Sequence, residues 1–86
     1  MFIVAVYDIQ VKRIQRVRQV MGKYLHAVQN SVFEGHLTAK QLGLMKQELQ
    51  KIAVPSEDSI LIYKYTQDTG VIKEQLGQIR KFPFIL

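Results

Sequence analysis

The sequence predicts an α+β protein, in which helices pack against one face of an antiparallel sheet. The chain has 86 residues, which is enough for one domain and too few for two. Apolar residues make up 48% of it, enough for a core, and their periodicity changes repeatedly between strand and helix spacing. The expected elements run strand, helix, strand, helix, strand, strand. This order indicates a ferredoxin-like βαββαβ domain over residues 1–78, followed by an apolar tail over residues 79–86.

The first half of the chain contains two expected strands around a helix. Residues 2–7 form a continuous apolar, β-branched run, typical of a central strand that is buried on both faces. From residue 11 to residue 25 the apolar positions recur at helical spacing. A second strand is expected over residues 27–36. Gln29 and Asn30 interrupt it with residues that favour a bulge or kink.

The second half begins with a helix that has clear start and stop signals. Thr38 and Gln41 have the spacing of a capping box, and apolar residues follow at helical steps. The segment 55–58 contains a proline and ends the helix. Residues 59–65 are then expected to form a third strand, and residues 71–76 a short fourth strand.

The first strand has apolar residues on both faces, and helices on one side of the sheet can cover only one of them. A chain this short buries only about 60–65% of its unfolded surface, so further cover is expected. A second copy packed sheet to sheet is the simplest cover, and the sequence therefore predicts a homodimer. The apolar end of the tail is expected to contact the dimer partner or another protein.

The net charge of +5 is concentrated in one segment. Between Ile9 and Phe33 there are five basic residues and no acid, whereas the charges of the remaining chain cancel. On the expected helix Arg18 lies near the apolar edge, and the other four cations project from the opposite side. Neighbouring like charges repel, which favours a bound nucleic-acid backbone over a solvated helix face. The predicted nucleic-acid-binding residues are Lys12, Arg13, Arg16 and Lys23.

Composition excludes several classes of protein. The chain has no cysteine, which excludes disulfide scaffolds and cysteine-based zinc, iron–sulfur or thiol chemistry. His26 and His36 lack ligand spacing, and we interpret neither as a metal ligand. No apolar run approaches the roughly 20 residues of a membrane span, so no membrane partner is expected. These features indicate a soluble, cytoplasmic protein.

Asp8 ends the first strand after a run of apolar residues, and two roles are open to it. It could be the N-cap of the following helix, or it could bind a metal ion. Carboxylate oxygen suits Mg²⁺, which keeps several of its waters and needs only one or two carboxylates together with phosphate oxygens. One aspartate per chain cannot hold two metal ions, but a pair across a two-fold axis could hold one.

Four sequence elements carry a resemblance to a known family. They are Val6–Asp8, the basic segment Lys12–Arg18, Val28–Gly35 (VQNSVFEG), and Glu57–Tyr63 (EDSILIY). In this order and spacing the chain resembles the small nuclease-like CRISPR-associated protein of the adaptation module, the partner of the CRISPR integrase. The resemblance implies a ferredoxin-like protomer and a dimer whose two sheets face each other. It also implies a role in acquiring spacers, in complex with the integrase and a fragment of double-stranded DNA.

The resemblance further implies roles for particular residues. Asp8 would be the catalytic and metal-binding residue, lying near its symmetry mate and holding Mg²⁺ or Mn²⁺ at the dimer interface. Arg13 and Arg16 are both candidates for the functional arginine of the family. Ala27 departs from the family pattern, because many relatives carry arginine there, which weakens the case for a full nuclease site. The secondary site candidates, which otherwise read as core or strand residues, are Tyr7, Ser31 and Phe33.

Three functions are compatible with these observations. We favour a homodimer that binds duplex DNA by its backbone and bridges integrase subunits. The alternative is a Mg²⁺-dependent endonuclease that cleaves RNA or double-stranded DNA at a pair of Asp8 side chains. A toxin-like ribonuclease of similar fold is the third.

Overall fold

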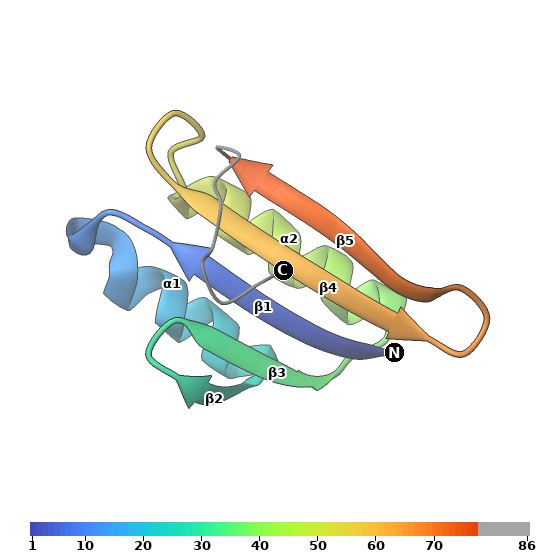
Figure 1. Ribbon diagram of the computed structural model, residues 1–86. Helices are drawn as coiled ribbons and strands as arrows, with labels where there is room; N and C mark the ends of the chain where they lie inside the picture. Colours follow the sequence, from blue (N-terminus) through green and yellow to red (C-terminus); the bar gives the residue numbers. More distant parts are fainter. Residues whose placement is uncertain (78–86) are drawn as a thin grey trace.

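Two helices cover one face of a five-stranded antiparallel sheet, and in Figure 1 both helices lie behind it. The computed structural model describes residues 1–77, and the predicted tail over residues 79–86 lies outside this range. The elements are β1 (Phe2–Asp8), α1 (Val11–Tyr24), β2 (His26–Gln29), β3 (Val32–His36), α2 (Ala39–Ile52), β4 (Ser59–Thr66) and β5 (Gly70–Gly77).

The strand order is β2-β3-β1-β4-β5, and every neighbouring pair is antiparallel. The strand β1 is central, with β3 on one side and β4 on the other. The elements from β1 to β4 therefore have the βαββαβ order, and β5 extends the sheet as a hairpin with β4. The predicted ferredoxin-like α+β class is confirmed.

The prediction of one interrupted strand over residues 27–36 was wrong. The segment forms a hairpin, in which β2 pairs with β3 and the chain reverses at Asn30 and Ser31. Asparagine and serine favour such turns because their short polar side chains bond to nearby backbone. The predicted bulge lies within β2, where the register shifts between Ala27 and Gln29. The additional strand completes the βαββαβ plan.

The main core lies between the sheet and the helices. It draws on alternate residues of β1 and β4 and on the apolar stripes of both helices, as the 3.6-residue and two-residue periods require. The capping box at the start of α2 is confirmed, with the Gln41 amide donating to Thr38 Oγ1 at 3.1 Å. Fully buried residues of this core include Ile3, Ala5, Val17, Met21, Met45, Leu49, Ile60 and Ile62.

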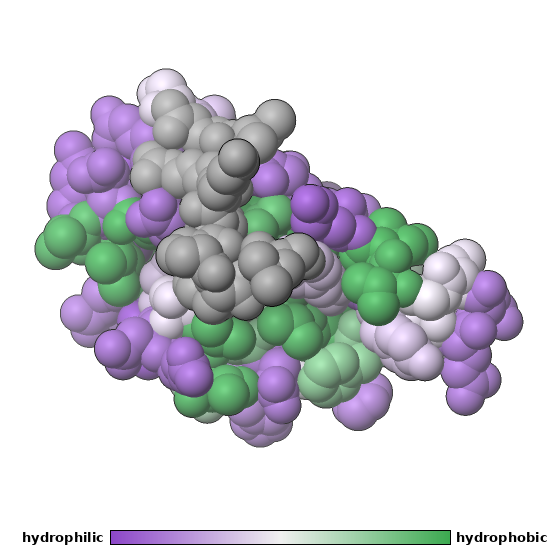
Figure 2. All heavy atoms as spheres, in the orientation of Figure 1, coloured by the Kyte–Doolittle hydropathy of each residue, from purple (hydrophilic) through white to green (hydrophobic). Residues whose placement is uncertain are grey.

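The opposite face of the sheet is also apolar, as the sequence predicted for β1. Val6 and Leu61 form a second cluster, against which Val4, Val32 and Tyr63 pack. These side chains alternate with those of the main core, so the helices do not cover them. Figure 2 shows apolar side chains gathered along this face. We refer to this surface, which the helices do not cover, as the open face below, although Val6 and Leu61 are themselves only 2% and 4% exposed.

Candidate functional site

Asp8 is the last residue of β1 and is exposed to solvent. In the sheet it lies opposite Ser59, the first residue of β4. On the other side, the Tyr7 amide donates to the carbonyl oxygen of Ser31 at 3.1 Å. The alternation of β1 places Asp8 on the same side as Val6, which is the open face. The structure therefore brings Asp8, Tyr7 and Ser31 to one end of the sheet.

Asp8 is not the N-cap of the following helix. Gln10 occupies that position, and its side chain makes no capping hydrogen bond. Among the described residues the first turn of α1 also contains no acid. The capping role that the sequence left open for Asp8 is thereby excluded.

Tyr7, which precedes Asp8 in β1, and Phe33 of β3 are buried in the main core, with their ring centroids 6.4 Å apart. Tyr7 also supports the turn between β2 and β3. The Tyr7 hydroxyl donates to the carbonyl oxygen of Asn30, and Arg18 donates both to that oxygen and to the Tyr7 hydroxyl. The Arg18 guanidinium also lies over the Phe33 ring, 5.3 Å from its centroid. Arg18 is half-buried at the edge of the core, as predicted. Its contacts with the turn were not predicted, because the turn itself was not.

The four predicted nucleic-acid-binding cations differ in their surroundings. Lys12 and Arg16 are exposed on α1, and neither has an ion-pair partner within residues 1–77. Lys23 is exposed but pairs with Glu48 of α2, and this hydrogen bond raises the pKa of Lys23 and lowers that of Glu48. Arg13 was predicted to face solvent, and this was wrong: only 8% of the residue is exposed.

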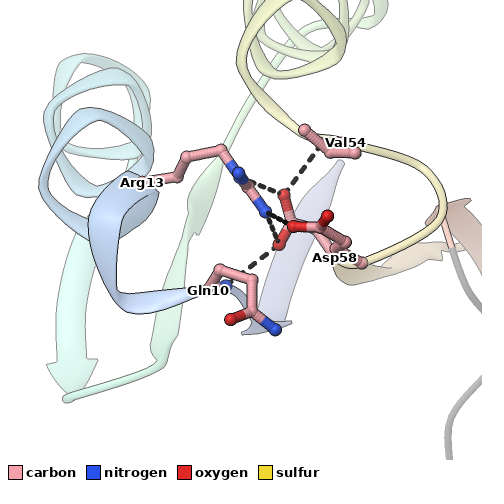
Figure 3. Close-up of polar contacts among 5 residues, drawn as sticks. Gln10, Arg13, Val54 and Asp58 are labelled. Carbon is pink, nitrogen blue, oxygen red and sulfur yellow. Dashed lines mark hydrogen bonds and ion pairs between the residues drawn. The ribbon is translucent and has the colours of Figure 1, made fainter.

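Arg13 is held by two acids from the loop between α2 and β4 (Figure 3). Its Nε donates to Asp58 Oδ2 at 2.6 Å and its Nη2 to Asp58 Oδ1 at 2.9 Å. The same Nη2 donates to Glu57 Oε1 at 2.8 Å. The Asp58 carboxylate also accepts the backbone amides of Gln10 at 2.9 Å and Val54 at 2.8 Å. Such bidentate, charge-assisted bonding matches the planar guanidinium to one carboxylate.

The Asp58 carboxylate is fully buried, yet it remains ionised far below neutral pH. Burial raises its pKa, but the hydrogen bond from Arg13 and the amides of Gln10 and Val54 outweigh this effect and lower the pKa to about 2. The ion pair is therefore intact under physiological conditions. The sequence motif EDS contained this acid, but nothing local indicated its partner, which lies 45 residues away.

The donors at the strand end fit a metal ion only when other groups complete its coordination. Within residues 1–77 no three side chains of the metal-binding types His, Cys, Asp and Glu come together as a metal site. Asp8 offers one exposed carboxylate per chain at this edge. Mg²⁺ can be held by one or two carboxylates with waters and phosphate oxygens, so a second copy or a bound nucleic acid would have to supply the rest.

The helices of the described region are too short or too polar to cross a membrane. The fold and the strand-end carboxylate define a class of small α+β proteins with a ferredoxin-like sheet, an open apolar face and a basic first helix. Residues 1–71 match the family model described as CRISPR associated protein Cas2. The chain belongs to this family, and the resemblance seen in its motifs is confirmed.

Named relatives and solved structures agree with this assignment. The chain is 41% identical over 77 residues to a CRISPR-associated endoribonuclease Cas2 of Methanosarcina acetivorans, covering 90% of this chain and 88% of that protein. It is 44% identical over 64 residues to a CRISPR-associated endoribonuclease Cas2 of Pyrococcus furiosus, covering 74% of this chain and 75% of that protein. The crystal structure of Streptococcus pyogenes Cas2 matches with a TM-score of 0.71 and 30% identity, covering 79% of this chain and 89% of that one. Another Cas2 crystal structure matches with a TM-score of 0.70 and 35% sequence identity, and the match covers 95% of this chain and 97% of that one.

Proposed function

We propose that this protein acts in CRISPR spacer acquisition, as a homodimer that binds duplex DNA by its backbone and bridges subunits of the CRISPR integrase. The observation that carries the proposal is the pair of exposed cations Lys12 and Arg16 on α1. They are four residues apart, so they lie on the same side of the helix with about 5–6 Å between their Cβ atoms. In a segment without acids they offer two positive charges to neighbouring phosphates.

The open face supports the proposed dimer. Val6 and Leu61 at its centre are buried, but Val4, Val32 and Tyr63 around them remain partly exposed. A second copy can cover these apolar side chains by a self-complementary contact. Asp8 lies on the same face, so a two-fold axis there would bring two carboxylates toward one another. Such a dimer would also present two copies of α1 to a DNA duplex. A cytoplasmic location is part of the same proposal.

Mg²⁺ or Mn²⁺ at the two Asp8 carboxylates is the cofactor that this arrangement would accept. When bound, the ion would polarise a phosphate oxygen and activate water. Asp8 would hold the ion, while Lys12 and Arg16 would bind the flanking phosphates. Tyr7, Ser31 and Phe33 would support the strand end rather than contact the nucleic acid.

A metal-dependent endonuclease acting on RNA or double-stranded DNA is the second candidate. The names of the relatives, which call those proteins endoribonucleases, favour it. An Asp8→Asn protein separates the two functions. The scaffold function predicts that spacer acquisition and DNA binding survive this change while any cleavage is lost; loss of acquisition with DNA binding intact would favour the nuclease.

The cations are tested by duplex DNA binding across a series of salt concentrations. A Lys12→Ala/Arg16→Ala protein should bind more weakly and show a salt slope reduced by roughly two per protomer in contact with the DNA. The matched control is Lys40→Ala/Lys51→Ala, which removes two exposed charges from α2. Equal losses in both variants would show that net charge, and not the α1 surface, drives binding.

A further inference from the structure

The buried Asp58 carboxylate joins two parts of the chain that are distant in the sequence. Its oxygens accept hydrogen bonds from the Arg13 side chain, from the Gln10 amide and from the Val54 amide (Figure 3). These groups belong to α1, to the link between β1 and α1, and to the segment that follows α2. One side chain therefore ties the start of the first helix to the end of the second.

Asp58 adjoins both backbone segments next to Asp8, one through its carboxylate and the other through the chain. Gln10 is two residues beyond Asp8 in the chain, and its amide is bound directly by Asp58. Ser59 follows Asp58 and lies opposite Asp8 in the β1–β4 register. A displacement of Asp58 would consequently move the partner strand beside Asp8 and the link that leaves it.

The pair also sets where α1 begins. The N-cap residue Gln10 makes no side-chain capping hydrogen bond of its own, and the first turn of the helix contains no acid. Asp58 supplies a negative charge from another element at this end, where it interacts favourably with the helix dipole. Arg13 lies between Lys12 and Arg16 in the helix, so its anchoring also determines where those two exposed cations stand.

We infer that Arg13 and Asp58 are a positioning pair, which fixes the Asp8 end of β1 relative to the cations of α1. This inference rests on the proposed function, in which that surface binds duplex DNA. Neither residue contacts the DNA in it. Arg13 acts through the placement of its neighbours, in contrast to the phosphate-binding role that the sequence predicted for it.

The inference is tested by whether DNA affinity rises or falls when the charge of Asp58 is removed. An Asp58→Asn protein loses a negative charge, and electrostatics alone would then tighten its binding to DNA. The positioning role predicts the opposite, a roughly three- to tenfold weaker affinity. Asp68→Asn is the matched control, because it removes an exposed acid from the turn between β4 and β5. A folded Asp58→Asn protein that binds DNA as tightly as the wild type, or more tightly, would overturn the inference.

A second variant and a second readout keep the test independent of DNA binding. Arg13→Lys retains the charge but loses the bidentate contact, so we expect weaker DNA binding in it as well. In amide hydrogen exchange followed by NMR, the Gln10 amide should exchange faster in Arg13→Lys and Asp58→Asn than in the wild type. The backbone amide resonance of Asp8 should also change its chemical shift in both variants. Asp68→Asn should leave both unchanged. An unmoved Asp8 resonance in the two pair variants would refute positioning, whereas a wild type without DNA affinity would refute only the proposed function.

Discussion

Lys12 and Arg13 are neighbours in the chain, yet their side chains have opposite environments. Lys12 is exposed, whereas Arg13 is buried with Asp58. On a helix Arg13 lies only about 40° from Val17, four residues further on, which is fully buried. Its position thus borders the core, and a cation there is stable because an acid from another element meets it. Periodicity located this border, but it contained no information about the acid.

Acid should weaken the protein through Asp58. The folded-state pKa of this carboxyl is about 2, below its ordinary value of 3.8. A lowered pKa means that the ion pair contributes stability in full above pH 4 and loses it as the pH falls toward 2. Urea denaturation between pH 7 and pH 2 should show a decline in the free energy of unfolding over this window. The decline should be smaller in Asp58→Asn; an equal decline would assign it to other groups.

The residues of the candidate site were only partly predictable. Asp8 could be placed at the end of β1 because an acid cannot continue a buried apolar run. Tyr7 and Phe33 could be identified as buried aromatics. The contacts of Arg18 with Asn30 and of Lys23 with Glu48 depend on which elements become neighbours, so no local pattern indicated them.

At the scale of elements, the segment from His26 to His36 shows the limit of local periodicity. Apart from Asn30 and Ser31, which can form either a bulge or a turn, the segment was compatible with one strand. Pairing decides between these, because β3 gains the central strand β1 as a partner only when the chain reverses. All four residues of β2 are exposed, so burial alone could not have revealed this strand.

Gly77, the last residue of β5, should tolerate a side chain far less well than Gly22 of α1. Gly77 has a φ of +81°, and a Cβ there would lie 2.0 Å from the Asp58 carbonyl oxygen. Gly77→Ala should therefore destabilise the fold by roughly 2 kcal/mol or more, since both the backbone conformation and the contact are unfavourable. Gly22→Ala in α1 meets no atom within 4 Å and should instead stabilise it by about 0.5–1 kcal/mol. Chemical denaturation gives the free energy of unfolding of each variant. Equal values for Gly77→Ala and Gly22→Ala would contradict this account of Gly77.

At the scale of the whole molecule, the open face is the surface through which the proposed dimer would form. Tyr63→Glu places a charge on that face, opposite Lys73 of β5, where a monomer can tolerate it. Two such charges across a two-fold axis would repel and lose apolar contact, so we expect the dimer to dissociate at least about tenfold more readily. Light scattering coupled to gel filtration gives the mass. Leu44→Glu on the exposed side of α2 is the control, and a Tyr63→Glu protein with the mass of the wild type would place the interface elsewhere.

The amino-acid sequence by itself determined the α+β class, the helix boundaries, the strand-end aspartate and the acid-free basic segment. These depend on the period of apolar residues, on caps and on charge, which are local properties of the chain. Only the tertiary structure decided that residues 26–36 form a hairpin and that Arg13 is buried while Lys12 and Arg16 remain exposed. The physical reason is that strand partners and ion-pair partners, such as Asp58 for Arg13, are chosen by packing between segments far apart in the chain.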